Sequence, residues 1–190
     1  MHPAFLFRPH PRLGKIVNAF QSTIRSIGPF SQLREEAGLS DCETGVIWPG
    51  MKVENLRSPY EKVGGIVYFG RMLDKIRLND TQHLPVDYHP NLGAGFDLRC
   101  VKLLGVQYKA LVARTRLGGS DDEILAWCQA QSSPLTEEQI EVWNDFMIKR
   151  GWRDAASERV HERKREYGLT HRSEIQTFFD LIEWDEERLK

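Results

Sequence analysis

The chain has 190 residues, of which 41% are hydrophobic and 28% are charged, and its formal net charge at pH 7 is −1. This composition is that of an ordinary globular protein long enough to bury a core, and the balanced charge creates no overall field that attracts nucleic acid or an acidic membrane surface. No apolar run approaches the roughly 20 residues that a membrane-spanning helix needs, so we expect no membrane partner.

The first region of the chain is basic and interrupted by prolines. Residues 1–30 hold four basic residues, four prolines and no acidic residue. Such a start is typical of an organelle transit peptide, but also of a disordered tail. A third interpretation is translation from a start codon upstream of the true one, for which Met51 is a natural candidate. We predict that residues 1–50 are a poorly structured extension, disordered or from an upstream start, and that residues 51–190 form the folded domain.

The folded region has the pattern of an all-α protein. Ser58, Ser120 and Thr136 are each followed three residues later by Glu or Gln, which is the spacing of a helix capping box. No segment shows sustained alternation of apolar and polar residues, so we expect little or no sheet. We predict a single compact domain of about six to seven helices. The predicted helices span residues 59–78, 97–104, 107–117, 121–130, 137–150, 153–167 and 173–187.

The first predicted helix carries charges where apolar residues are expected. On a helical wheel of about 100° per residue, Asp74 and Arg77 fall on the apolar face, and their spacing of three lets them pair. Arg71 and Lys75 lie at the edge of this face, four residues apart, where two like charges favour an acidic partner or an anion. Gly64-Gly65 inside this helix would cost about 1 kcal/mol per glycine, which close helix packing or the approach of a ligand would justify.

Two interpretations of these charges stay open. They form a buried or half-buried ion network that ties the helix to its neighbours, or they form a polar pocket that holds a ligand or transfers a proton. The pocket would also include polar residues of the loop that follows. The full candidate set is Arg71, Asp74, Lys75, Arg77, Tyr88, His89 and Asp97.

The loop over residues 83–97 has the residue types of a metal site but not the spacing. His83, Asp87 and His89 straddle a proline and match no compact ligand motif. We therefore predict no metal and no cofactor. Asp97 is either the N-cap of the next helix or a partner for a basic residue, with Arg71, Lys75 and Arg99 as the candidates.

Cysteine usage and charge patterning bear on location and partners. Cys42, Cys100 and Cys128 are odd in number and far apart, which favours free thiols in a reducing compartment and so a cytoplasmic protein. Cys100 lies on the apolar side of its predicted helix, as a core thiol does. Residues 153–167 hold five basic and four acidic side chains, a mixed-charge surface that makes nucleic-acid binding an unfavoured alternative.

Several short strings in the folded region occur together: Leu56-Arg57-Ser58-Pro59, Gly64-Gly65, Arg71-Met72-Leu73-Asp74-Lys75, Tyr88-His89-Pro90, Phe96-Asp97, Arg150-Gly151-Trp152 and Phe178-Phe179-Asp180. This set resembles the strings of a family of bacterial proteins known as a domain of unknown function. The resemblance covers the chain from about Val53 to near its C-terminus, and it implies a bacterial, cytoplasmic protein to which residues 1–50 are an extension. It carries no established activity.

Three functions follow as hypotheses. The first is a non-enzymatic helical domain that binds a protein or a small ligand, and it predicts an exposed apolar patch. The second is an enzyme or small-molecule binder, and it predicts that the candidate polar residues converge on one cavity. The third, nucleic-acid binding, needs a basic stripe that the charge count does not provide. No catalytic residue is assigned, and whether the chain is an enzyme stays open.

Overall fold

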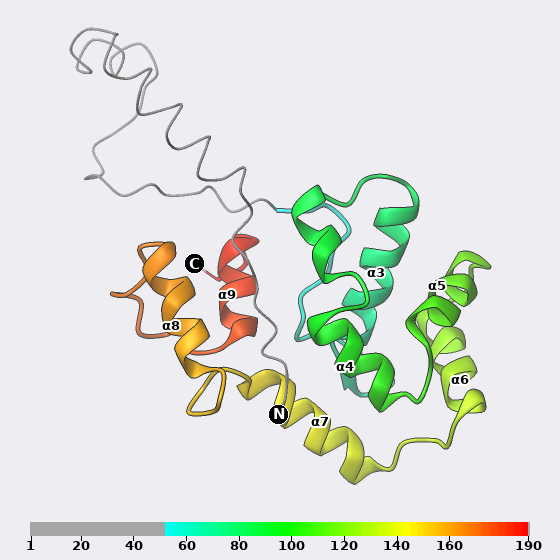
Figure 1. The fold of residues 1–190 in the computed structure, drawn as a ribbon. Helices are drawn as coiled ribbons and strands as arrows, with labels where there is room; N and C mark the ends of the chain where they lie inside the picture. The colour runs from blue at the N-terminus through cyan, green and yellow to red at the C-terminus, as the bar shows by residue number, and fades with distance from the viewer. Residues whose placement is uncertain (1–51, 190) are drawn as a thin grey trace, which may run out of the picture. The chain divides into compact units, whose positions relative to one another are not determined.

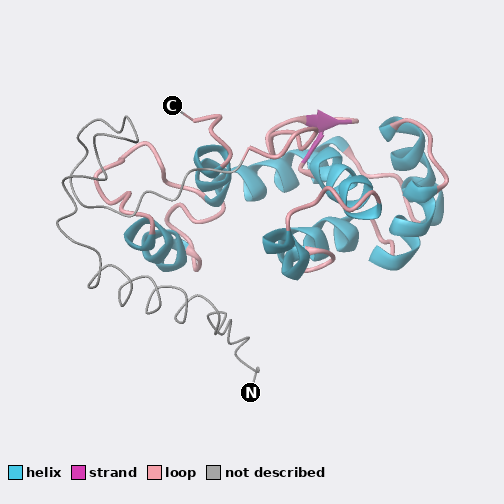
Figure 2. Ribbon diagram, turned by 90° about the horizontal axis from the view of Figure 1, so that it is seen from above, coloured by secondary structure: helices cyan, strands magenta, loops and turns pink. Residues whose placement is uncertain are grey.

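The computed structural model describes residues 52–189, so the predicted N-terminal extension lies outside the described residues. The described part is helical, with one short hairpin, which confirms the all-α prediction (Figures 1 and 2). Its elements in chain order are β1 (Lys62–Val63), β2 (Ile66–Val67), α3 (Phe69–Asp80), the 3₁₀ helix η1 (Val86–Asn91), α4 (Gly95–Leu103), α5 (Tyr108–Arg116), α6 (Asp121–Gln131), α7 (Glu137–Lys149), α8 (Ser157–Glu166) and α9 (Phe178–Asp185).

The helix predicted over residues 59–78 is wrong in its first half, where the chain forms the hairpin. β1 and β2 pair antiparallel, with Val63 opposite Ile66. Gly64 and Gly65 make the turn with φ of 53° and 81°, the left-handed conformation that both central residues of a type I′ turn require. The two glycines therefore close a hairpin rather than interrupt a helix.

The predicted capping boxes start the helices in two of three places. Ser120 and Thr136 cap α6 and α7 as predicted. At Ser58 the same spacing forms a turn instead, in which the Tyr60 N–H donates to Ser58 Oγ at 3.1 Å. A capping box at Thr177, which we did not predict, starts the last helix at residue 178 rather than at the predicted residue 173.

Helix α3 is the centre of the fold. Nine of its 12 residues are buried, so any charge on it has to find a partner inside the protein. The hairpin and α5 pack directly on α3, and α7 contacts both β2 and α9. The main hydrophobic core draws residues from the hairpin, α3 to α7 and α9. In Figure 1, α7 runs below α4, with α5 and α6 beyond its start and α8 and α9 beyond its end.

Two smaller clusters complete the interior. Val53 and Leu56 pack against Leu78 at the end of α3 and Leu84 in the loop that follows. Val160, Leu169, Ile175 and Leu181 join α8, the loop after it and α9.

Across the described residues, none of the helices combines the length and apolarity needed to cross a bilayer.

Candidate functional site

The four charges singled out on α3 are buried to different degrees. Arg71, Asp74 and Lys75 are only 3%, 7% and 2% exposed. The Arg77 side chain is 37% exposed, so its predicted place on the apolar face is wrong. The predicted place of Arg71 and Lys75 at the edge of that face is also wrong, because both are buried. The wheel misplaced them because it assumed a helix that begins ten residues earlier and buries one side, whereas α3 is buried nearly all round.

Arg71 binds a carboxylate from the far end of the chain. Its Nη1 donates to Glu186 Oε2 at 3.0 Å and to the Arg57 carbonyl at 2.8 Å, and its Nη2 donates to Glu186 Oε1. Tyr88 OH and Arg188 Nη1 donate to the same carboxylate, at 2.8 and 2.5 Å. Burial alone would raise the pKa of Glu186, but the hydrogen bonds and charge of Arg71 outweigh it and hold the pKa below its ordinary value. The pair is therefore ionised at neutral pH.

Lys75 lies in a second closed group. Its Nζ donates to Asp97 Oδ1 at 2.5 Å and to Tyr68 OH at 3.0 Å, while Tyr68 OH donates to Asp97 Oδ1 at 2.9 Å. The Gly93 N–H donates to the other oxygen of Asp97. Burial lowers the pKa of Lys75, and Asp97 opposes that shift. Ala94, not Asp97, is the N-cap of α4, so the second interpretation of Asp97, as a partner for a basic residue, describes its position.

Asp74 is bound by an arginine that the sequence analysis did not single out. Arg57 donates from Nε to Asp74 Oδ2 at 2.6 Å and from Nη2 to Oδ1 at 2.7 Å, and its Nη1 lies 2.7 Å from Asp121. Arg77 Nη1 lies 2.7 Å from Asp121 and 3.6 Å from Asp74. A side chain at residue 70 would overlap the Arg57 guanidinium, so Gly70 leaves the room that this arginine needs. The only sign of Arg57 in the sequence was its place in the Leu56-Arg57-Ser58-Pro59 string.

The seven candidate residues thus divide into separate groups rather than lining one cavity. His89 is exposed, and its Nε2 lies 3.3 Å from the Leu84 carbonyl oxygen. Within residues 52–189, every buried side-chain nitrogen and oxygen has a hydrogen-bond partner, and no group of three or more His, Cys, Asp or Glu side chains is placed to hold a metal. This geometry favours the ion network over the polar pocket as the role of the α3 charges.

A polar groove of about 520 Å³ lies beside this network. Of the seven candidates, only Asp74 lines this groove. The two arginines that also line the groove, Arg57 and Arg188, already bind carboxylates. Both arginines of this groove are therefore already neutralised. Its lining residues are Lys52, Val53, Glu54, Asn55, Leu56, Arg57, Glu61, Asp74 and Arg188.

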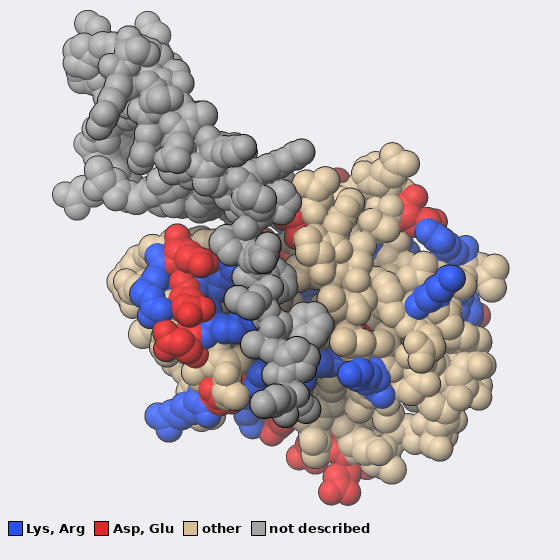
Figure 3. Space-filling view, in the orientation of Figure 1, with Lys and Arg blue, Asp and Glu red and all other residues tan. Residues whose placement is uncertain are grey.

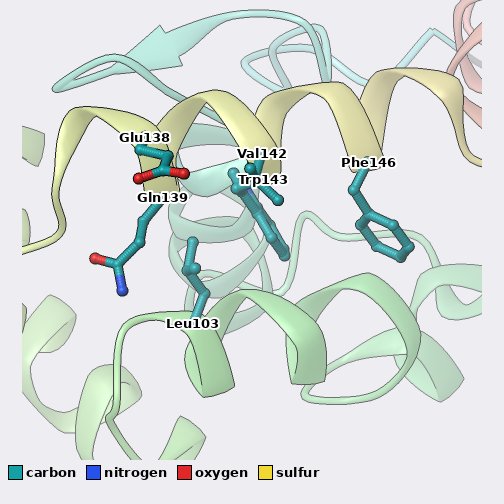
Figure 4. A pocket seen from close by; sticks show the side chains of 6 residues that line it. All are labelled: Leu103, Glu138, Gln139, Val142, Trp143 and Phe146. Atoms are coloured by element: carbon teal, nitrogen blue, oxygen red, sulfur yellow. The ribbon is translucent and has the colours of Figure 1, made fainter.

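A second groove, between α4 and α7, is apolar and open. Figure 4 shows Leu103 pointing from α4 towards α7, and Trp143 and Phe146 pointing from α7 towards α4. The groove has a volume of about 330 Å³. We call it the α4–α7 groove, and it is lined by Leu103, Glu138, Gln139, Val142, Trp143 and Phe146.

The exposure of its apolar side chains sets the α4–α7 groove apart. Val142 is 63% and Phe146 is 36% exposed, whereas Trp143 is only 7% exposed and is fixed by a 3.2 Å hydrogen bond from Nε1 to the Val67 carbonyl. Val142 and Phe146 were not among the candidate residues predicted from the sequence. The signal was present, because the apolar residues of α7 cover a wider arc than one core-facing stripe requires.

Comparison with known proteins gives a family and no activity. The family model described as Domain of unknown function (DUF5069) matches residues 53–188. This range agrees with the resemblance seen in the sequence strings. No curated protein and no solved structure matches the chain.

Proposed function

The chain belongs to the family Domain of unknown function (DUF5069), and from its geometry we propose that it is a non-enzymatic domain that binds a helical segment of a partner protein in the α4–α7 groove. The observation that carries this proposal is the exposure of Val142 and Phe146 beside the fixed indole of Trp143. Exposed apolar side chains gathered in a groove mark interaction sites, and aromatic residues are enriched among those that dominate binding energy.

A helix is the occupant that suits this groove. Both walls are helices, so the groove is flanked by side chains rather than by an exposed strand edge that would pair with an extended peptide. Helical segments fill such grooves with apolar residues at positions i, i+3 or i+4, and i+7. The partner would therefore bury one apolar stripe against Leu103, Val142 and Phe146.

The charged residues of α3 support a scaffold role. The carboxylates of Asp74, Asp97 and Glu186 are each held by a basic side chain and at least one further donor. Their polar atoms are therefore already engaged. The helix that these ion pairs hold in place contacts β1 of the hairpin, and α7 packs on β2 of the same hairpin.

The test is selection of helical peptides on the full-length chain. A displayed library of peptides of about 15 residues, the length at which isolated helices become marginally stable, should yield binders with a repeating apolar stripe. Val142→Asp and Phe146→Asp should each abolish their binding, because a carboxylate in the groove meets no partner when the peptide covers it.

The matched control is Val86→Asp, which places the same charge on another apolar side chain that is 73% exposed and lies outside the groove. It should leave peptide binding unchanged, and circular dichroism should show all three variants folded. Binders that ignore Val142→Asp and Phe146→Asp, or a selection without binders, would overturn the proposal.

We further propose a cytoplasmic location. Both cysteines within the described residues, Cys100 and Cys128, are buried free thiols, and burial raises the pKa of each thiol and so keeps it in the unreactive protonated form. Free thiols are the usual state of cysteine in a reducing compartment. Labelling of a tagged full-length chain after cell fractionation checks this proposal.

A further inference from the structure

Two arginines flank the Phe146 ring at one end of the α4–α7 groove. The guanidinium carbon of Arg99, on α4, lies 5.3 Å from the ring centroid, and that of Arg150, just after α7, lies 5.5 Å from it. Cation–π contacts of this length hold a guanidinium against the ring while its remaining N–H groups stay available. This end of the groove therefore presents an aromatic face bordered by positive charge.

The two arginines differ in how far their charge is compensated. Arg150 Nη1 pairs with Asp154 at 2.6 Å. Arg99 forms no ion pair with any other residue between 52 and 189, and the same is true of Lys102, one turn further along α4; both are exposed. The α4 wall thus carries positive charge that the described residues do not neutralise.

At the opposite end of the groove, the α7 wall has the opposite sign. Glu138, in the first turn of α7, lines that end and is exposed. The acid nearer to Phe146, Asp145, is already paired with Lys149 at 2.6 Å. Figure 3 shows acidic side chains at the bottom of the view, where α7 begins, and basic side chains above them over α4. Phe146 and Glu138 are eight residues apart on one helix, which corresponds to about 12 Å.

We infer that the helix bound in the α4–α7 groove has an acidic side chain in its first turn beside Arg99 and a basic side chain near its last turn beside Glu138, and so runs antiparallel to α7. This inference rests on the proposed function. Charge complementarity favours an acid beside Arg99 and a base beside Glu138. A helix favours acids near its N-terminus and bases near its C-terminus, so the same arrangement fixes its direction.

The test uses two peptides of identical composition that share the apolar stripe selected on the groove. One has Glu in its first turn and Lys in its last turn, and the other has these charges exchanged. The first should bind the full-length chain more tightly. Arg99→Glu should weaken the first peptide about 2- to 5-fold, the range expected of one exposed ion pair, and should strengthen the exchanged one.

The charge-reversal comparison separates a local ion pair from other effects. If the exchanged peptide binds more weakly only because it is less helical, it will bind more weakly than the first peptide to both the wild-type chain and Arg99→Glu. If Arg99 pairs with the first-turn Glu, the order of the two affinities reverses in Arg99→Glu. Lys109→Glu is the matched control, since Lys109 is an exposed base on α5 outside the groove, and it should change both affinities equally.

The outcomes distinguish the two proposals. If binding depends on Val142 and Phe146, but the two peptides bind equally well and Arg99→Glu changes neither affinity, the inference about charge is wrong. The proposal that the groove binds a helix then remains supported. If Val142→Asp leaves binding intact, the proposed function itself falls. If the wild-type chain sediments as a dimer that Val142→Asp converts to a monomer, the occupant is a second copy of the chain and the inference is overturned.

Discussion

At the scale of single residues, the buried charges of α3 illustrate how an ion pair can fix a structure without adding much to its stability. Desolvation offsets most of the Coulomb attraction inside a protein, so an intact buried pair contributes little net free energy, while removal of one partner costs about 3–5 kcal/mol. Arg71 with Glu186 is the clearest case, since both side chains are at most 3% exposed.

The pH dependence of stability should report the Arg71–Glu186 pair. The folded-state pKa of Glu186 lies below its ordinary value of 4.5, so the pair stabilises the fold above that value and the contribution is lost as the pH falls through the folded pKa. Glu186→Gln should therefore lower the melting temperature most at pH 7, and the difference from wild type should shrink below about pH 4.5. Melting curves between pH 7 and pH 3 measure this, and a difference that stays constant across the range would contradict it.

The candidate site was only partly predictable from the sequence, for a reason that lies at this scale. The spacing of Arg71, Asp74 and Lys75 marked them as charges in need of partners, and Asp97 was one of the partners considered. Glu186 was not among the candidate residues, because it lies 115 residues from Arg71. Helical periodicity describes only neighbours along the chain, so it contains no information about a partner this distant.

At the scale of elements, local signals predicted helix starts well where the side chain itself makes the cap. Ser120 and Thr136 start α6 and α7 at the predicted residues. The hairpin was missed because Val63, Ile66 and Val67 have a spacing that suits one helix face as well as two short strands. The deciding residues were Gly64 and Gly65, whose positive φ no helix allows.

Substitution of Gly64 should show how tightly the hairpin is fitted. A Cβ on Gly64 would overlap the Leu125 side chain on α6, whereas a Cβ on Gly95, which has the same φ of 53°, would meet nothing within 4 Å. Both Gly64→Ala and Gly95→Ala pay the left-handed strain of about 1–2 kcal/mol, and only Gly64→Ala adds an overpacking cost of about 1–3 kcal/mol. Urea denaturation of the two variants measures the difference in the free energy of unfolding. Equal decreases would show that Leu125 on α6 moves aside without an energetic cost.

At the scale of the whole molecule, the interior is divided unequally. The main core spans the hairpin, α3 to α7 and α9, while α8 and the loop after it join α9 through a smaller cluster of four buried hydrophobic residues. Lys164 strengthens this smaller region, because its buried ammonium donates to the carbonyls of Arg172 and Ile175 at 2.5 and 2.8 Å. Regions with few buried contacts open at lower free energy than the main core.

Removal of the Lys164 ammonium should therefore loosen one region only. Lys164→Met keeps the buried stem but leaves the two carbonyls without this donor, so amide hydrogen exchange should rise across residues 169–176 and stay unchanged in α3. Lys149→Met, which removes an exposed ion pair on α7, is the control and should change neither region. Faster exchange throughout the molecule would show that the two regions unfold together.

The distance along the chain between Arg71 and Glu186 also has a consequence for how the protein forms. While the ribosome is still adding residues 72 to 185, the guanidinium of Arg71 has no Glu186 to neutralise it, so α3 cannot be buried in its final surroundings at acceptable cost. Contacts between segments this far apart in sequence form late and slow the folding reaction. Completion of the central helix therefore waits until Glu186 has been synthesised, and a chain cut short before α9 would keep its core open.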